Sequence, residues 1–246
     1  MTEFVLFRYR PANEYLYDSL RNSTIFFSSP GNLNDPFDCQ IDIDRCLSNS
    51  IDESEGATKA YLEILKKLPK FSPSLQRALT SVGICSFSLT LVDPLMWAHY
   101  ADNHRGVCLM YRFGEDFFQD ERHKIIGVVP VEYGTSPLRD WFKTVAPTLG
   151  EPASRSMGIE MCKKFFTVKG ECWNYEREIR VIRETPGPFE IPRDSLAQIC
   201  FGLRTSAEVK TAVRSCVSHS SVTYCQIVRD GTDFGITAND EQFTKR

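Results

Sequence analysis

The sequence has no apolar run approaching the roughly 20 residues that a membrane-spanning helix needs. Its opening apolar run, Phe4–Phe7, is followed at once by charges and is too short for the core of a secretion signal. Basic residues are not in excess, since the net charge is −3. A broad nucleic-acid-binding surface needs a basic excess, so that class is disfavoured. These absences predict a cytoplasmic protein with no membrane partner.

Several motifs with known chemistry are missing as well. There is no G-x-G-x-x-G, no G-x-x-x-x-G-K-[ST] and no G-x-S-x-G, so Rossmann, P-loop and serine-hydrolase sites are not indicated. The nine cysteines include no C-x-x-C pair, which disfavours zinc and predicts buried thiols in a reducing compartment. His99 and His104 are five residues apart, which does not fit a H-E-x-x-H metal site. No bound metal is therefore expected.

Apolar periodicity indicates one α+β domain over residues 1–246, with a central mixed or antiparallel sheet, whole or split, flanked by helices. The predicted strands are Glu3–Arg10, Thr24–Ser28, Ile84–Ser88, Val107–Phe113, Ile125–Tyr133, Tyr175–Arg183, Gln198–Gly202 and Val222–Val228, with a short final strand near Phe234–Ile236. The predicted helices are Glu14–Asn22, one that Pro94 begins, about Ser156–Phe166, and one that Thr205 or Ser206 caps. Residues of about 45–82 are predicted to form a helical insertion or lid, with Ser74 capping a helix through Leu79.

The segment from Tyr175 to Val181 is the first candidate for chemistry. On a strand, Glu176, Glu178 and Arg180 would share one face. Two carboxylates on one face repel, which raises a pKa or requires a cation or hydroxyl partner. Such a pair suits acid–base work or the orientation of a sugar hydroxyl. The alternative is the solvated face of an edge strand.

Two further segments have polar or charged residues at positions where a purely hydrophobic core would have apolar ones. Asn34 and Asp35 lie in a turn-rich loop, which is either a rigid turn or the mouth of a polar site. Arg8 and Arg10 lie on the first strand, where a charge among apolar residues is costly unless it is paired. Arg8 is therefore expected to meet a carboxylate such as Glu178 or to bind an anion.

The helix after Pro94 has an aromatic side. Met96, Trp97 and Tyr100 cover one face, which is either core or a stacking surface for a ligand. His99 lies off that stripe, either as a structural histidine or beside a cleft.

The segments FRYRPANEYLYDSL, IFFSSPGNLNDPFDC, ICSFS, LMWAHYADNHRGVCLMY and YEREIRVI together resemble a bacterial family known as domain of unknown function 2971. Some of its members are described as abortive-infection proteins. The resemblance runs from about Leu6 to Gly202 and implies a role in phage defence without implying a chemistry.

The order of elements also resembles ADP-ribosyltransferases of the DarT and RNA 2′-phosphotransferase type. Arg8 of LFRYR stands at the first-strand position, where the closer subgroup has a His, and Glu178 stands at the late catalytic glutamate with Glu176 two residues before it. The resemblance implies an NAD-consuming transferase, a toxin or defence effector, acting on a protein or nucleic-acid acceptor, with an antitoxin or defence protein as a further partner. It implies Glu178 and Glu176 as catalytic residues and, as NAD-binding residues, Arg8, Ser28, Asn34, Asp35, Phe87, Trp97, His99, Tyr100 and Arg180.

Two other classes stay open. In a metal-dependent nuclease or nucleotide hydrolase, Asp35, Asp38, Glu176 and Glu178 would bind the metal, since hard cations favour carboxylate oxygens. In a non-catalytic sensor or partner-binding module, the same charges would be structural. Magnesium dependence separates the first class from an NAD-consuming enzyme, and a Glu178→Gln variant with full function would indicate the second.

Overall fold

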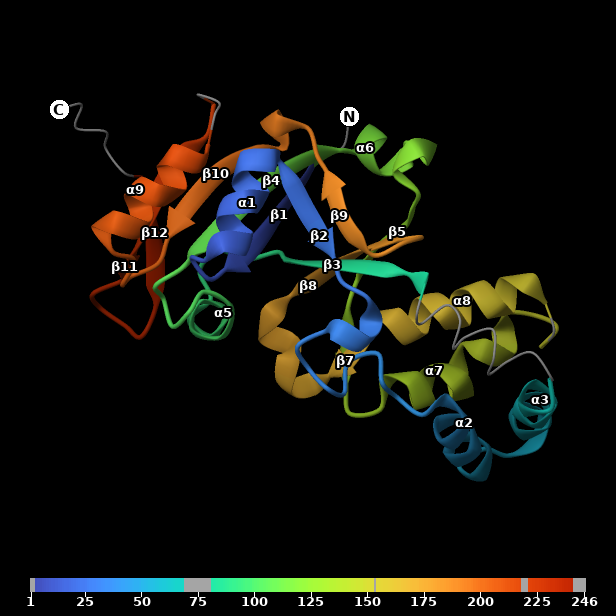
Figure 1. Ribbon diagram of the computed structural model, residues 1–246. Helices are drawn as coiled ribbons and strands as arrows, with labels where there is room; N and C mark the ends of the chain where they lie inside the picture. The colour runs from blue at the N-terminus through green and yellow to red at the C-terminus, as the bar shows by residue number, and fades with distance from the viewer. Residues whose placement is uncertain (1–2, 69–80, 153, 218–220, 241–246) are drawn as a thin grey trace.

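The first strand lies in the middle of the main sheet and fixes the layout of the molecule. The computed structural model describes residues 3–68, 81–152, 154–217 and 221–240. Strand β1 (Glu3–Arg10) alternates as predicted: Leu6 belongs to one hydrophobic cluster, and Phe7 and Tyr9 belong to another. Each face of β1 is therefore covered by its own layer of side chains. Figure 1 shows β1 beside β4, its main partner in the sheet.

The main sheet has eight strands in the order β12-β11-β10-β4-β1-β3-β8-β5. Its members are β1, β3 (Gly83–Ser88), β4 (Val107–Gly114), β5 (Ile125–Pro130), β8 (Glu178–Arg183), β10 (Leu196–Phe201), β11 (Thr223–Arg229) and β12 (Ile236–Asp240). Strands β10 and β11 pair in parallel and the others are antiparallel. The predicted α+β class and mixed sheet are confirmed.

The sheet is split between β1 and β3. Strand β1 pairs with β4 along its whole length, but it meets β3 only at Phe7 and Ser88. Strand β2 (Thr24–Phe27) pairs with β9 (Gly187–Glu190), and the residue after it, Ser28, bridges to Ile84 of β3. A third, parallel pair joins β6 (Glu132–Gly134) to β7 (Val168–Gly170). The split leaves room between the two halves of the sheet.

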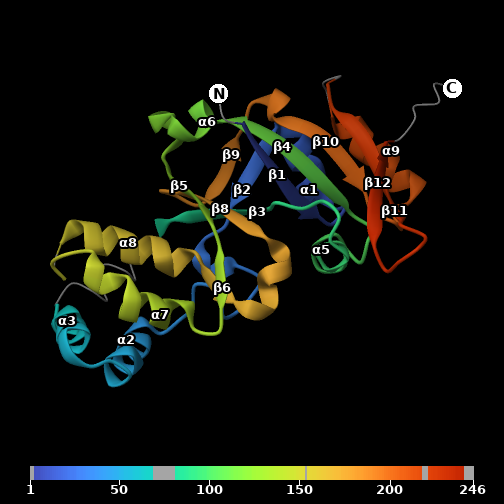
Figure 2. The ribbon, with the colours of Figure 1, turned by 180° about the vertical axis from the view of Figure 1, so that it is seen from behind.

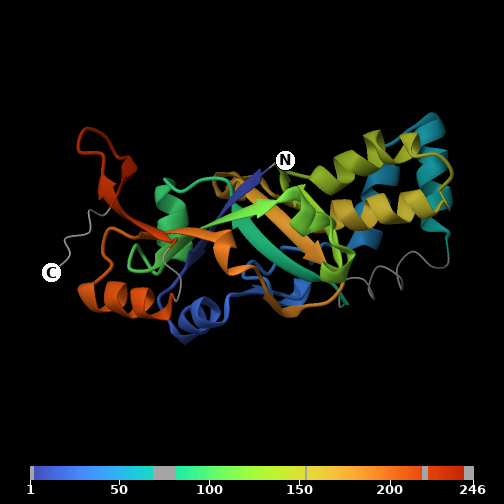
Figure 3. The same ribbon diagram turned by 90° about the horizontal axis from the view of Figure 1, so that it is seen from above.

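Helices cover both faces of the half that contains β1. Helices α1 (Glu14–Asn22) and α9 (Ala207–Cys216) share a cluster with Leu6, whereas α5 (Pro94–Tyr100) packs on the face of Tyr9. Figure 3 shows α1 and α9 on one side of the strands and α5 on the other. Asn13 caps α1 and Asp93 caps α5, as the sequence predicts.

The other half of the sheet packs against a separate group of helices. Helices α2 (Ile43–Asp52), α3 (Gly56–Lys66), α7 (Pro137–Thr144) and α8 (Arg155–Phe166) share a hydrophobic cluster with Ile84 and Ile182. Figure 2 shows this group at the end of the molecule away from α9. The helix predicted after Ser74 lies outside the described residues. Shorter helical elements complete the chain: η1 (Pro30–Asn32), α6 (Glu115–Gln119), η2 (Glu121–His123), η3 (Ala146–Thr148), η4 (Glu171–Glu176) and η5 (Arg193–Ser195).

Three predicted strands were wrong in their bounds. The final strand, predicted near Phe234–Ile236, is β12 at Ile236–Asp240. The predicted strand Ile125–Tyr133 is two, β5 and β6, which pair with different partners. The predicted strand Tyr175–Arg183 starts only at Glu178, because residues up to Glu176 form the 3₁₀ helix η4 and Arg177 is left-handed with φ 45° and ψ 51°. Glu176 and Glu178 therefore do not share a strand face. In the described part of the chain, no helix is both long enough and apolar enough to cross a membrane.

Candidate functional site

A cavity of about 1170 Å³ lies at the split in the sheet. Strands β1 and β3 line it together with the end of α1, strand β2, the loop that follows β2, and residues 188–193. Tyr100 of α5, Lys169 of β7, Glu176 of η4 and Glu178 of β8 also line it. No residue of the described part of the predicted insertion, 45–68, reaches this cavity; α2 instead lines a smaller one of about 360 Å³.

Five buried charged side chains form a cluster at one wall of the large cavity. We call Asp38, Lys169, Glu176, Glu178 and Arg180 the buried charge cluster; each is at most 6% exposed. The Lys169 ammonium lies 2.6 Å from Glu176 and 3.5 Å from both Glu178 and Asp38. Three carboxyl groups thus face two cationic groups. Full ionisation would leave one excess negative charge in a buried place, which is unfavourable.

Arg180 connects the buried charge cluster to the surrounding chain. Its guanidinium donates to both carboxylate oxygens of Glu178, at 2.9 and 3.1 Å, and to Asp38 at 2.5 Å. It also donates to the Phe166 carbonyl at 2.8 Å. Arg180 has no exposed surface, so it acts on the cavity only through these partners. The ion pairs connect the loop after β2 to strand β8.

Glu176 and Glu178 have opposite electrostatic properties. Burial would raise the pKa of Glu178, but Arg180 and Lys169 outweigh it and lower the pKa to about 2. Burial raises the pKa of Glu176 above its ordinary value, despite the opposing effects of Lys169 and Tyr100. Glu178 is therefore ionised at neutral pH, and of the two glutamates Glu176 takes up a proton more readily.

Tyr100 and Asn34 extend the cluster toward the cavity mouth. The Tyr100 hydroxyl donates to Oε1 of Glu176 and accepts a hydrogen bond from the Asn34 side chain at 3.3 Å. Burial, and next the Glu176 carboxylate, raise the pKa of Tyr100, so its hydroxyl stays protonated and can donate. The Lys169 ammonium lies 5.0 Å from the centre of the Trp173 ring, which adds a cation–π contact.

Arg8 and Arg10 lie on another wall of the cavity. Arg8 donates to the Phe26 carbonyl at 3.1 Å and lies 5.9 Å from the centre of the Phe87 ring. Among the described residues, no carboxylate lies within 4.0 Å of either guanidinium. Of the two alternatives expected for Arg8, the ion pair with a carboxylate such as Glu178 therefore does not form, and anion binding stays a prediction. Burial, and next the charge of Arg8, lower the pKa of Arg10.

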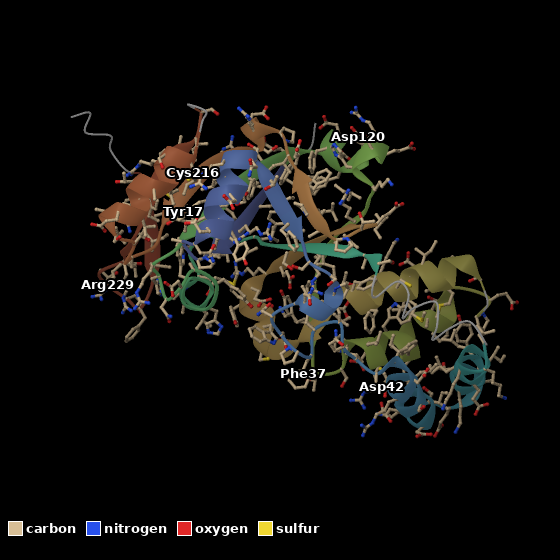
Figure 4. All side chains as sticks on the ribbon, viewed as in Figure 1. Tyr17, Phe37, Asp42, Asp120, Cys216 and Arg229 are labelled. Carbon is tan, nitrogen blue, oxygen red and sulfur yellow. The ribbon has the colours of Figure 1, made fainter. Side chains whose placement is uncertain are left out.

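The structure gathers most of the residues predicted from the sequence around this cavity. Those that line it are Arg8, Ser28, Asn34, Phe87, Tyr100, Glu176 and Glu178. Asp35, Trp97 and His99 do not line the cavity, and Arg180 lies behind Glu178. All four residues have structural partners. Asp35 accepts from the Phe37 backbone at 2.9 Å within the loop that Figure 4 marks with Phe37. Trp97 is fully buried against Tyr9, and His99 is exposed with Nδ1 3.1 Å from the Tyr175 hydroxyl.

Two residues of the site, Lys169 and Tyr133, were not predicted from the sequence. Lys169 holds three carboxylates, and the Tyr133 hydroxyl accepts a hydrogen bond from the Glu178 backbone at 2.8 Å. A signal for Lys169 was present: it is a lone cation after Phe165, Phe166 and Val168, where a charge needs a partner. No feature of the sequence around Tyr133 indicates that this residue belongs to the site. Within the described residues, no group of three or more His, Cys, Asp or Glu side chains could hold a metal ion.

A family model for "Protein of unknown function (DUF2971)" matches residues 96–181 of the chain. The resemblance to this family is confirmed. The matched segment contains Tyr100, Lys169, Glu176 and Glu178, whereas Arg8 and Asp38 precede it. No curated protein and no solved structure matches the chain.

Proposed function

We propose that the protein is an NAD-consuming enzyme of the ADP-ribosyltransferase type, which binds NAD in the large cavity and transfers its ADP-ribosyl group. The observation that supports this most is one cavity lined both by arginines without a carboxylate partner and by two buried glutamates of opposite pKa shift. NAD needs cationic partners for its phosphates and a negative group beside the ribose that becomes positively charged.

In the proposed reaction, the bond between ribose C1 and the nicotinamide nitrogen breaks, and its electron pair leaves with nicotinamide. The ionised Glu178 supplies negative charge near the cation that develops on the ribose. Glu176 accepts the proton of the incoming acceptor as that acceptor bonds to C1, because a carboxyl with a raised pKa is the better base. Tyr100 and Lys169 orient Glu176. Phe87 and Tyr100 provide apolar surface for the nicotinamide ring.

The biological role that we propose is that of a toxin or phage-defence effector in the cytoplasm. It follows from the resemblance to the abortive-infection-associated family and extends beyond the chemistry of the site. The acceptor is a protein or a nucleic acid, and an antitoxin or another defence protein would restrain the enzyme.

A ligand-binding sensor is the second candidate, and one observation favours it. Both oxygens of Glu178 are held by Arg180, and Lys169 lies near all three carboxylates of the buried charge cluster. A wall whose charges are already matched can shape a pocket without taking part in a reaction.

Release of nicotinamide from NAD by the purified protein, with and without cell lysate, tests the proposal. Wild-type protein should release nicotinamide, and Glu176→Gln should slow the release about 100-fold or more, as expected for loss of a general base. Glu178→Gln should slow it as well. Glu171→Gln is the matched control, because Glu171 is an exposed carboxylate of the same helix η4 and should leave the rate unchanged.

Calorimetry with NAD distinguishes the remaining outcomes. Binding of NAD without release under any acceptor condition would favour the sensor. Neither release nor binding would refute both the transferase and an NAD sensor.

A further inference from the structure

The two arginines of β1 form a cationic pair inside the cavity. Arg8 and Arg10 are two residues apart on a strand, so their side chains project from the same face at a spacing of roughly 7 Å. Both line the cavity, and β1 is fixed between β3 and β4 in the middle of the sheet. The pair is therefore presented from a rigid element.

This arrangement is unfavourable for the protein alone. Two like charges lie close together, partly removed from solvent, and no described carboxylate forms an ion pair with either. Burial and the neighbouring charge of Arg8 both disfavour the charged form of Arg10. Arg21, which also lines the cavity, differs because Asp18 pairs with it at 2.8 Å. An anionic ligand would supply the charge that Arg8 and Arg10 lack.

The spacing of the pair selects the kind of anion. A guanidinium binds phosphate oxygens in pairs, and two guanidinium groups at this spacing match two linked phosphates better than one. Arg8, Arg10, Glu176 and Glu178 all line the same cavity. An extended ligand held by the arginines can therefore also reach the glutamates.

We infer that Arg8 and Arg10 together form a binding site for a diphosphate, and that the ligand of this cavity is a diphosphate-linked nucleotide whose sugar points toward Glu176 and Glu178. The inference rests on the proposed function for the position of the sugar, but the anion site itself requires no chemistry. It adds Arg10 to the residues that recognise the ligand.

Calorimetric titration with inorganic pyrophosphate tests the site, with orthophosphate and sulfate as single anions. Pyrophosphate should bind more tightly than either. Arg8→Met and Arg10→Met should each weaken pyrophosphate binding about tenfold or more, because each removes charge-assisted hydrogen bonds. Arg112→Met is the matched control: Arg112 is an exposed arginine on the adjacent strand β4, outside the cavity, and its loss should not change the affinity.

Thermal unfolding separates a binding role from a structural one. Because Arg10 is charged, partly buried and unpaired by carboxylates, Arg10→Met should keep or raise the melting temperature. A clear drop in the melting temperature of Arg10→Met, or pyrophosphate binding that is equal in all variants, would overturn the inference.

Competition experiments identify the source of the diphosphate. ADP, ADP-ribose and NAD should each displace pyrophosphate, whereas nicotinamide should not. Displacement without nicotinamide release would leave the diphosphate site valid and refute the transferase. Nicotinamide release that is unaffected by Arg8→Met and Arg10→Met would refute the diphosphate site and leave the transferase valid.

Discussion

Arg180 shows how a single residue can be functional in appearance and structural in role, and its partner Glu178 how one residue can have both roles. The sequence motif suggested that both would contact a ligand, yet Arg180 is fully buried and uses its guanidinium on Glu178, Asp38 and a carbonyl. A buried ion pair stabilises a fold little compared with an apolar pair of the same shape, but removing one partner costs about 3–5 kcal/mol. Glu178 therefore contributes to the integrity of the wall as well as to the charge of the cavity.

The pKa of Glu178 gives a pH-dependent prediction. A carboxyl whose folded pKa is about 2, against an ordinary 4.5, contributes stability above the ordinary value and loses that contribution as pH falls toward 2. The free energy of unfolding of Glu178→Gln should therefore lie below that of wild type by about 3 kcal/mol at neutral pH. This difference should shrink below about pH 5, as the wild-type carboxyl becomes protonated.

Urea unfolding of both proteins across this pH range provides the measurement. The raised pKa of Glu176 acts in the opposite direction, and this rise should be smaller in Glu178→Gln because the charge of Glu178 contributes to it. A difference that stays constant from neutral pH to pH 2 would contradict the ion-paired state of Glu178.

At the scale of elements, the junction of η4 and β8 decides where the two glutamates point. Helix η4 ends at Glu176, and Arg177 in the left-handed conformation turns the chain into β8. The backbone N–H of Arg177 closes the turn by donating to the Asn174 carbonyl at 3.2 Å. One residue in an unusual conformation thus brings two carboxylates from different elements to Lys169.

Substitution of Arg177 tests the importance of this turn. Asn tolerates the left-handed region, whereas a β-branched side chain does not. Arg177→Asn should change the free energy of unfolding little, and Arg177→Val should lower it by about 1–2 kcal/mol. Under the proposed function, Arg177→Val should also slow nicotinamide release while Arg177→Asn should not. Equal melting curves for the two variants would show that the turn is not strained.

The elements themselves were largely predictable, and this junction was not. Strand Glu3–Arg10 and helix Glu14–Asn22 have the predicted bounds, because alternation and an Asn cap are local signals. The segment from Tyr175 to Val181 also alternates, so the sequence favoured one long strand. The left-handed turn at Arg177 opposes that local pattern, and the contacts that come with it, from Lys169 and Tyr100, are tertiary.

At the scale of the whole molecule, the site depends on pairings that no single segment encodes. The cavity exists because β1 and β3 meet at one residue pair and then diverge. Its charge balance depends on Arg180 meeting Asp38, which lies 142 residues earlier in the chain. Polar residues in three distant segments indicated that a site should form, but only the fold determines that Tyr100 belongs to it and that Trp97 belongs to the core.

The burial of the cysteines shows how side chains pack across the whole molecule. The predicted burial of thiols is confirmed for seven of the nine, and these seven occur in all three hydrophobic clusters. Cys172, on η4, is exposed, and Cys162 is partly exposed. Burial raises the pKa of Cys39 to about 12 and that of Cys46 to about 11, so these thiols are protonated and unreactive at neutral pH.

Titration of the native protein with a thiol reagent should therefore show one fast reaction, a slower second one, and the remaining thiols only after unfolding. Cys172→Ser should remove the fast phase, and Cys162→Ser should remove the slower one. The buried thiols lie in every hydrophobic cluster. If all of them become reactive at the same denaturant concentration, the three clusters unfold together. Early reaction of only Cys39 and Cys46, both in the cluster with α7 and α8, would instead show that this helical group opens separately from the sheet half that contains β1.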